Sequence, residues 1–146
     1  MGLLVTFFLV SIIFSFLCSI LEAVLLSITP AYVGIQENKK TAIAEDLTRF
    51  KADIDQPLAA ILTLNTIAHT VGAIGVGSQA AVIFSETDIN VMGFSPNWEA
   101  LIAGGMTLSI LILSEVIPKT LGANKWELMT KFTVRALQIM HFVLSP

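Results

Sequence analysis

Glu22 lies near the end of a long apolar run, and three serines precede it at regular intervals. Ser11, Ser15, Ser19 and Glu22 follow one another at steps of four, four and three residues. This spacing places their side chains on one face of a helix. An ionisable group inside a membrane is costly and is therefore a candidate functional residue. In the alternative interpretation the serines bond to carbonyls of their own helix and let a neighbour approach closely, and Glu22 is solvated near the membrane surface.

A second carboxylate, Glu115, lies in the segment Ser114-Glu115-Val-Ile-Pro118-Lys119. Proline has no N–H, so Pro118 would leave the Ser114 carbonyl without its usual helical partner and bend the helix. A freed carbonyl beside a carboxylate forms an oxygen-rich pocket, and transporters use broken helices of this kind to hold ions. In the alternative interpretation the helix ends here at the membrane surface, and Glu115 pairs with Lys119 in solvent.

The apolar segment between these two carries polar and small residues on two helix faces. Asn65, His69 and Gly72 share one face, and Thr66, Thr70, Ala73 and Gly77 share the other; Gly75 is a further small residue. The amide oxygen of Asn65 is a competent ligand for a hard cation, although a membrane asparagine also serves as an interhelical hydrogen-bond donor. We expect His69 to be a hydrogen-bonded core residue, because no second His or Cys lies at ligand spacing. We expect the glycines to let a second helix pack closely.

The candidate ligands are thus hydroxyl, amide, carbonyl and carboxylate oxygens. Such sites suit hard cations such as Mg²⁺, Ca²⁺ or Na⁺ and argue against Zn²⁺ or Cu⁺. The sequence shows no combination of a nucleophile, a base and a residue that orients the base, so it does not predict an enzyme.

The composition indicates which elements must position these residues. Of the 146 residues, 55% are hydrophobic and only 13% are charged, whereas a soluble domain carries about 25% charged residues. The mean hydropathy is +0.82. These values predict an all-α membrane protein and exclude a disordered chain. The single cysteine, Cys18, excludes a disulfide module, and a net charge of -3 excludes a nucleic-acid-binding domain.

Three apolar segments are long enough to cross a hydrocarbon core, which requires about 20 helical residues. They cover about residues 2–29, 57–84 and 99–118. The first segment has no basic residue ahead of it and is longer than a signal-peptide core, so we expect it to be retained as a span.

All 8 basic residues lie either between the first two spans or from the end of the third span onward. They are Lys39, Lys40, Arg49, Lys51, Lys119, Lys125, Lys131 and Arg135. The segment 85–98 contains Glu86 and Asp88 and no basic residue. The positive-inside rule therefore predicts that the N-terminus is outside and the C-terminus is in the cytoplasm. We expect the chain to be an integral protein of the cell inner membrane.

Two cytoplasmic segments, about residues 31–56 and 123–142, are expected to be helical. Apolar residues recur at helical spacing in both: Ile43, Leu47 and Phe50 in the first, and Trp126, Met129, Thr133, Leu137 and Met140 in the second. The second helix is expected to lie in the headgroup plane with its apolar stripe toward lipid. The first is equally consistent with a surface helix that packs on other parts of the protein. Because the sequence stops within an apolar run, we expect it to be part of a longer protein.

These residues resemble the membrane domain of the CorC and cyclin-M (CNNM) family of magnesium transporters. The matching elements are Ser19-Ile-Leu-Glu22-Ala23, Leu64-Asn65-Thr66 and Glu115-Val-Ile-Pro118-Lys119-Thr120. The resemblance covers essentially the whole chain, 1–146. It implies a homodimer in the lipid bilayer, with three short helices per subunit around a cation and a juxtamembrane helical belt. It also implies cytoplasmic CBS modules in the full-length protein, which this sequence does not include.

The resemblance further implies a function and a set of ligands. The function would be sodium-coupled export of Mg²⁺, with Na⁺ as the second ion. The side-chain ligands would be Ser19, Asn65 and Glu115, with a carbonyl oxygen from about Ser114 and with Glu22 as a further ligand or a counter-charge for Na⁺. One alternative is a sensor that binds a cation and regulates another transporter without conducting ions. Another is a structural anchor for the cytoplasmic modules.

Overall fold

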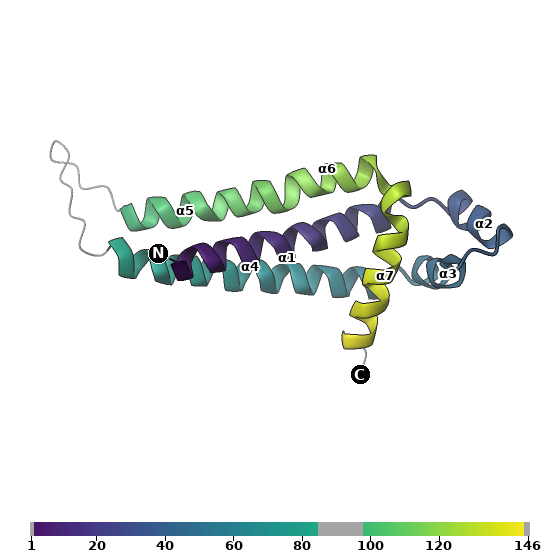
Figure 1. Cartoon of the computed structure of the whole chain (residues 1–146), viewed down its shortest axis with the longest axis horizontal. Coiled ribbons are helices and arrows are strands. Elements are labelled where there is room, and N and C mark those ends of the chain that lie inside the picture. Colours follow the sequence, from purple (N-terminus) through teal and green to yellow (C-terminus); the bar gives the residue numbers. More distant parts are fainter. Residues whose placement is uncertain (1, 85–97, 145–146) are drawn as a thin grey trace.

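The computed structural model describes residues 2–84 and 98–144, and every regular element within these ranges is a helix. Three long helical stretches lie side by side as a bundle: α1 (Gly2–Ser27), α4 (Asp55–Phe84), and a third made of α5 (Trp98–Leu111), the π-helical η1 (Ile112–Val116) and α6 (Ile117–Asn124) (Figure 1). Three shorter helices gather at one end of the bundle: α2 (Pro30–Asn38), α3 (Ala44–Ala52) and α7 (Trp126–Leu144).

Each long stretch contains a helix that is long and apolar enough to cross a membrane, namely Gly2–Ser27, Asp55–Ile83 and Gly104–Asn124. This confirms the predicted all-helical fold with three spans. The third helix does not end at Pro118, as the sequence suggested, but continues to Asn124. The acidic segment with Glu86 and Asp88 falls at 85–97, outside the described residues.

The first juxtamembrane segment contains two helices rather than one. The hydroxyl of Thr29 accepts a hydrogen bond from the backbone N–H of Tyr32 and so caps α2, and Pro30 occupies a first-turn position where no intrahelical N–H is needed. The chain then turns at Lys40, whose φ of 48° is left-handed, before α3 begins.

The hydrophobic core lies where the second half of α1 meets these shorter helices. Its buried residues come from five helices and the link after α1: Cys18, Ile20, Leu21, Val24, Leu25, Ile28, Val33, Leu47, Phe50, Ile61, Val134 and Leu137. The Tyr32 and Trp126 rings pack edge to face with centroids 5.0 Å apart and join α2 to α7. Lys51 of α3 donates to the Leu25 carbonyl at 3.2 Å, so a cation caps the carboxyl end of α1. Burial lowers the pKa of Lys51.

The expected orientation of the α7 stripe is wrong. Thr133 and Leu137 are buried, and the other three stripe residues, Trp126, Met129 and Met140, pack against the core. The stripe therefore faces the bundle and not lipid. A different apolar face of α7 is exposed, formed by Leu128, Phe132, Ile139 and Phe142.

The glycines of α4 do allow close helix packing, as expected, and the helix that approaches is α1 of the same chain. A Cβ at Gly72 would clash with Ser11 Oγ, and one at Gly75 would lie 2.6 Å from the Phe7 ring. Gly77 has no such neighbour within 4 Å. Ser11 also donates to the Ala68 carbonyl of α4 at 2.9 Å. The glycines thus fix the separation of α1 and α4 along the face that carries the serines.

Candidate cation site

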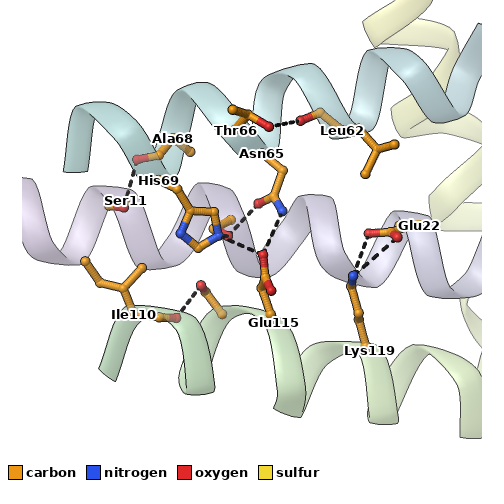
Figure 2. A network of polar contacts seen from close by, with 12 residues as sticks. Ser11, Glu22, Leu62, Asn65, Thr66, Ala68, His69, Ile110, Glu115 and Lys119 are labelled. Atoms are coloured by element: carbon orange, nitrogen blue, oxygen red, sulfur yellow. Dashed lines mark hydrogen bonds and ion pairs between the residues drawn. The ribbon is translucent and has the colours of Figure 1, made fainter. Parts of the chain in front are cut away.

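Four polar side chains from three helices converge near the middle of the bundle (Figure 2). Ser15 of α1 donates to Asn65 Oδ1 at 2.5 Å, and its Oγ lies 2.7 Å from His69 Nε2. Glu115 of η1 extends across to α4, where its Oε1 lies 3.2 Å from His69 Nε2 and accepts from Asn65 Nδ2 at 3.4 Å. We call these four residues the central cluster.

Local helix geometry explains how each side chain reaches the cluster. Asn65 and His69 are four residues apart on α4 and therefore lie on one face. Glu115 lies in a π-helical turn in which the Ile117 N–H donates to the carbonyl of Ile112, five residues earlier. A π turn holds one residue more than an α turn, so it changes the direction in which Glu115 points.

Pro118 follows this turn directly and is buried. It lies in the first turn of α6, but the helix runs on without a break from η1, so the missing N–H leaves the Ser114 carbonyl without that partner. The disturbed backbone predicted at Pro118 is therefore present as a π turn. The alternative in which the helix ends here is wrong, because α6 continues to Asn124.

The cluster has a buried side and an open side. Ser15 is fully buried and Asn65 is 6% exposed, whereas the side chains of His69 and Glu115 are 23% and 31% exposed. The latter two line a cleft of about 410 Å³ between α4 and α5–η1, together with Thr70, Ala73, Ile74, Thr107, Ile110 and Leu111. The carboxylate thus faces space large enough for water or an ion.

The two serines of the predicted ligand set differ in their hydrogen bonding. The Ser19 Oγ is fully buried and has no hydrogen-bond partner among the described residues. The Ser114 hydroxyl donates to the carbonyl of Ile110 within its own helix. Ser19 therefore offers a free oxygen, while any contribution from Ser114 would come from its carbonyl, to which Pro118 has no N–H to donate.

Glu22 takes part in a separate contact closer to the end of the bundle that carries α7. Its carboxylate lies 3.1 Å and 3.3 Å from Lys119 Nζ, which joins α1 to α6 (Figure 2). The ion pair proposed between Glu115 and Lys119 is therefore not the one that forms. Lys119 instead neutralises Glu22, and Glu115 is left to interact with α4.

Sequence reasoning did not assign Ser15 and His69 to the ligand set. Both carried a signal: Ser15 is the middle residue of the serine series, and His69 follows Asn65 at a spacing of four. The structure confirms that His69 is hydrogen-bonded in the interior, and it adds that the partners are Ser15 and Glu115.

The donor chemistry of this region fits a divalent cation with few charged ligands. Among the described residues, no three side chains of His, Cys, Asp or Glu form a group that could hold a metal. A cation here could instead draw on one carboxylate together with neutral hydroxyl, amide and backbone carbonyl oxygens. Such mixed sites keep several water ligands, and the open cleft provides room for them.

Fold and site together define a helical membrane domain with three spans around a polar cluster, a transporter-type domain rather than a catalytic one. The chain belongs to the cyclin M family, because the family model described as the cyclin M transmembrane N-terminal domain matches residues 4–146. This confirms the resemblance seen in the sequence. The family is associated with magnesium transport.

A relative supports the same assignment. The chain is 31% identical over 129 residues to the UPF0053 protein sll1254 of Synechocystis sp. (strain ATCC 27184 / PCC 6803 / Kazusa). The alignment covers 85% of this chain and 34% of that protein, so the chain spans about a third of the relative's length. No solved structure matches this chain.

Proposed function

We propose that this domain transports Mg²⁺ across the membrane and couples its export to Na⁺. The observation that carries the proposal is the approach of Glu115 to Asn65 near the middle of the bundle, with the two side chains 3.4 Å apart at the edge of a cleft. Intramembrane ionisable residues that face a cavity are typical of ion pathways.

The proposed ligands are Glu115, Asn65 and Ser19, with the Ser114 carbonyl as a backbone ligand. The carboxylate supplies the charge, the amide and hydroxyl supply neutral oxygens, and water in the cleft completes the shell. The buried Ser19 Oγ supports this set, because a hydroxyl without a hydrogen-bond partner costs free energy that a cation would recover. Glu22 is paired with Lys119, and we propose it as a counter-charge near the inner mouth of the path rather than a Mg²⁺ ligand.

We predict that Glu115→Gln removes the stabilisation of the protein by Mg²⁺. The substitution keeps the side-chain shape and its contact with Asn65 but deletes the charge, and Coulomb terms are large in a site of low dielectric constant. A ligand at 100 times its dissociation constant stabilises a protein by about 2.7 kcal/mol, and a non-binder does not. The melting temperature in detergent, measured with and without Mg²⁺, checks this.

Thr66→Val is the matched control. Thr66 is adjacent to Asn65, but its exposed hydroxyl donates to the Leu62 carbonyl of its own helix at 2.8 Å. This variant should retain the full Mg²⁺-dependent shift. An equal shift in wild type and Glu115→Gln would remove Glu115 from the site and with it the main support for transport.

Flux measurements separate transport from sensing. Sealed vesicles that contain only this protein and hold Na⁺ inside should take up Mg²⁺ from outside as Na⁺ leaves. Binding in detergent without any flux in vesicles would favour the sensor instead, and tolerance of apolar substitutions at Asn65 and Glu115 would favour the structural anchor.

A further inference from the structure

The face of α7 that points away from the core carries large apolar side chains along most of the helix. The residues of this face follow one another at steps of four, three, four and three: Leu128, Phe132, Arg135, Ile139 and Phe142. Leu128 and Phe142, at its two ends, are 83% and 86% exposed. Nothing in the part of the chain that the structure describes therefore covers this face, which we call the outer face of α7. A continuous exposed apolar surface marks a site of interaction with a membrane or a partner.

The position of α7 sets the depth at which its outer face lies. In Figure 1, α7 runs across the end of the bundle, and it contacts α1, α4 and α6. Its inner face belongs to the same core as Val24 and Leu25 of α1 and Ile61 of α4. These residues lie within the end turns of two spans, so α7 packs beside the ends of the spans. An outward surface at this depth meets lipid headgroups and the acyl chains next to them.

Two cations accompany the apolar residues of the outer face. Arg135 lies within it, and Lys131 precedes Arg135 by four residues, so the two side chains are neighbours on the helix surface. Both are exposed, and neither forms an ion pair with any described residue, including Glu127 of the same helix. Lys and Arg can lay their aliphatic stems on apolar surface while their charged ends reach a phosphate.

We propose that the outer face of α7 binds anionic phospholipids of the leaflet on its side of the membrane. The apolar side chains enter the boundary between headgroups and acyl chains, and Lys131 and Arg135 hold the phosphate of an anionic headgroup. A second copy of this chain fits the face less well, because a twofold contact would place its Lys131 and Arg135 against the same two cations. The inference concerns the cytoplasmic-side helices and does not depend on the proposed transport.

Spin labels on the outer face identify what covers it. The full chain is labelled with a nitroxide at Ile139→Cys or Leu128→Cys and placed in vesicles of phosphatidylglycerol and phosphatidylcholine. Both labels should collide readily with oxygen, which concentrates in lipid, and rarely with a water-soluble nickel chelate. A label at Ala42→Cys, an exposed position between α2 and α3, should show the opposite preference. The parent chain should take up no label, because Cys18 is buried.

Either of two other results would overturn the proposal. Labels at Ile139→Cys and Leu128→Cys that collide with neither reagent would show that protein covers the outer face, as in contact with a second copy. Labels that collide mainly with the nickel chelate would show that the face lies in water.

Lipid titrations in a neutral detergent test the preference for anionic headgroups. Phosphatidylglycerol should raise the melting temperature of the full chain at lower concentration than phosphatidylcholine does, and inorganic phosphate should have no such effect. The double variant Lys131→Gln with Arg135→Gln should bind phosphatidylglycerol more weakly by on the order of tenfold or more, with little change for phosphatidylcholine.

Lys39→Gln with Lys40→Gln is the charge-matched control, since it removes two exposed cations at the turn between α2 and α3. This variant should bind phosphatidylglycerol like wild type. Equal losses in the two double variants would show a general attraction to net charge and would overturn a lipid site on α7.

Discussion

Lys119 determines which partners the carboxylates of Glu22 and Glu115 have. It binds Glu22 of α1 and so leaves Glu115 with the central cluster. Glu22 is the more buried partner, with 14% of its side chain exposed against 43% for Lys119. Loss of the lysine would therefore leave a carboxylate without a partner in a mostly apolar setting.

We predict that Lys119→Met destabilises the domain by on the order of 1–3 kcal/mol, the cost of an unsatisfied buried polar group. The double variant Glu22→Gln with Lys119→Met should recover much of the loss, because no charge is then left unpaired. Unfolding midpoints in detergent for the two single variants and the double variant measure this coupling. A solvated Glu115–Lys119 pair would instead give only about 0.3–0.5 kcal/mol and no coupling to Glu22.

The sequence predicted the main candidate ligands but not their partners. Glu115 and Asn65 were found because polar residues are costly in apolar segments, and the structure brings them together. The pairing of Lys119 with Glu22, and of Glu115 with His69, depends on how the helices are rotated about their axes. Residues 97 positions apart in the chain, as Lys119 and Glu22 are, carry no local sign of such a contact.

At the scale of elements, Pro118 shows what the rule that proline disturbs a helix can and cannot predict. The absence of an N–H at Pro118 requires a rearranged backbone, and this was predicted. Whether the helix ends, kinks or adopts a π turn depends on the neighbouring helix, because α6 continues along α1. Gly122 makes that continuation possible, since a Cβ there would lie 2.8 Å from Ala23 Cβ and 3.1 Å from the Ile20 carbonyl oxygen.

We predict that Gly122→Ala destabilises the bundle by about 1–3 kcal/mol, the usual cost of an overpacked contact. The added methyl group would push α6 away from α1 and lengthen the nearby contact between Lys119 and Glu22. The unfolding midpoint in detergent checks the prediction.

Gly104→Ala is the matched control, since a Cβ at Gly104 meets nothing within 4 Å. This variant should be as stable as wild type or gain up to about 1 kcal/mol from helix propensity. If both alanine variants lose the same stability, the close approach of α6 to α1 is not what Gly122 provides.

At the scale of the whole molecule, the shorter helices form a core that hydrophobic spacing predicted only in part. The spacing of Leu47 and Phe50 indicated an apolar face of α3 but left open whether it meets lipid or protein, and the structure buries it in the protein. The same kind of pattern in α7 indicated an apolar face but not its neighbour. A periodic stripe looks identical whether it meets lipid or protein, and only the arrangement of α7 across the ends of the spans decides this (Figure 1).

The homodimer remains a proposal that rests on the family resemblance. α1 of the same chain packs against Gly72 and Gly75, so a helix from a second subunit cannot pack there as well. On another face of α4, Thr66 and Thr70 are exposed, and Ala73 and Gly77 are partly exposed. This face could contact a second subunit.

The distribution of charge over the molecule supports a prediction about its orientation in the membrane. All 8 basic residues belong to α3, α6, α7 or the short segments that follow α2 and α6. The end of the bundle with α2, α3 and α7 is thus the basic end (Figure 1). Since short basic segments stay on the cytoplasmic side, we expect this end to face the cytoplasm.

Cysteine labelling in intact cells checks this orientation. Ala42→Cys, at an exposed position between α2 and α3, should react with a membrane-impermeant thiol reagent only after permeabilisation. Thr87→Cys, in the acidic segment outside the described residues, should react without it. The parent chain is the control, because its single cysteine, Cys18, is buried at 5% exposure and should remain unlabelled. Labelling of Ala42→Cys but not of Thr87→Cys in intact cells would show that the orientation is opposite to the predicted one. The side from which Mg²⁺ enters the cleft beside Glu115 would then be reversed as well.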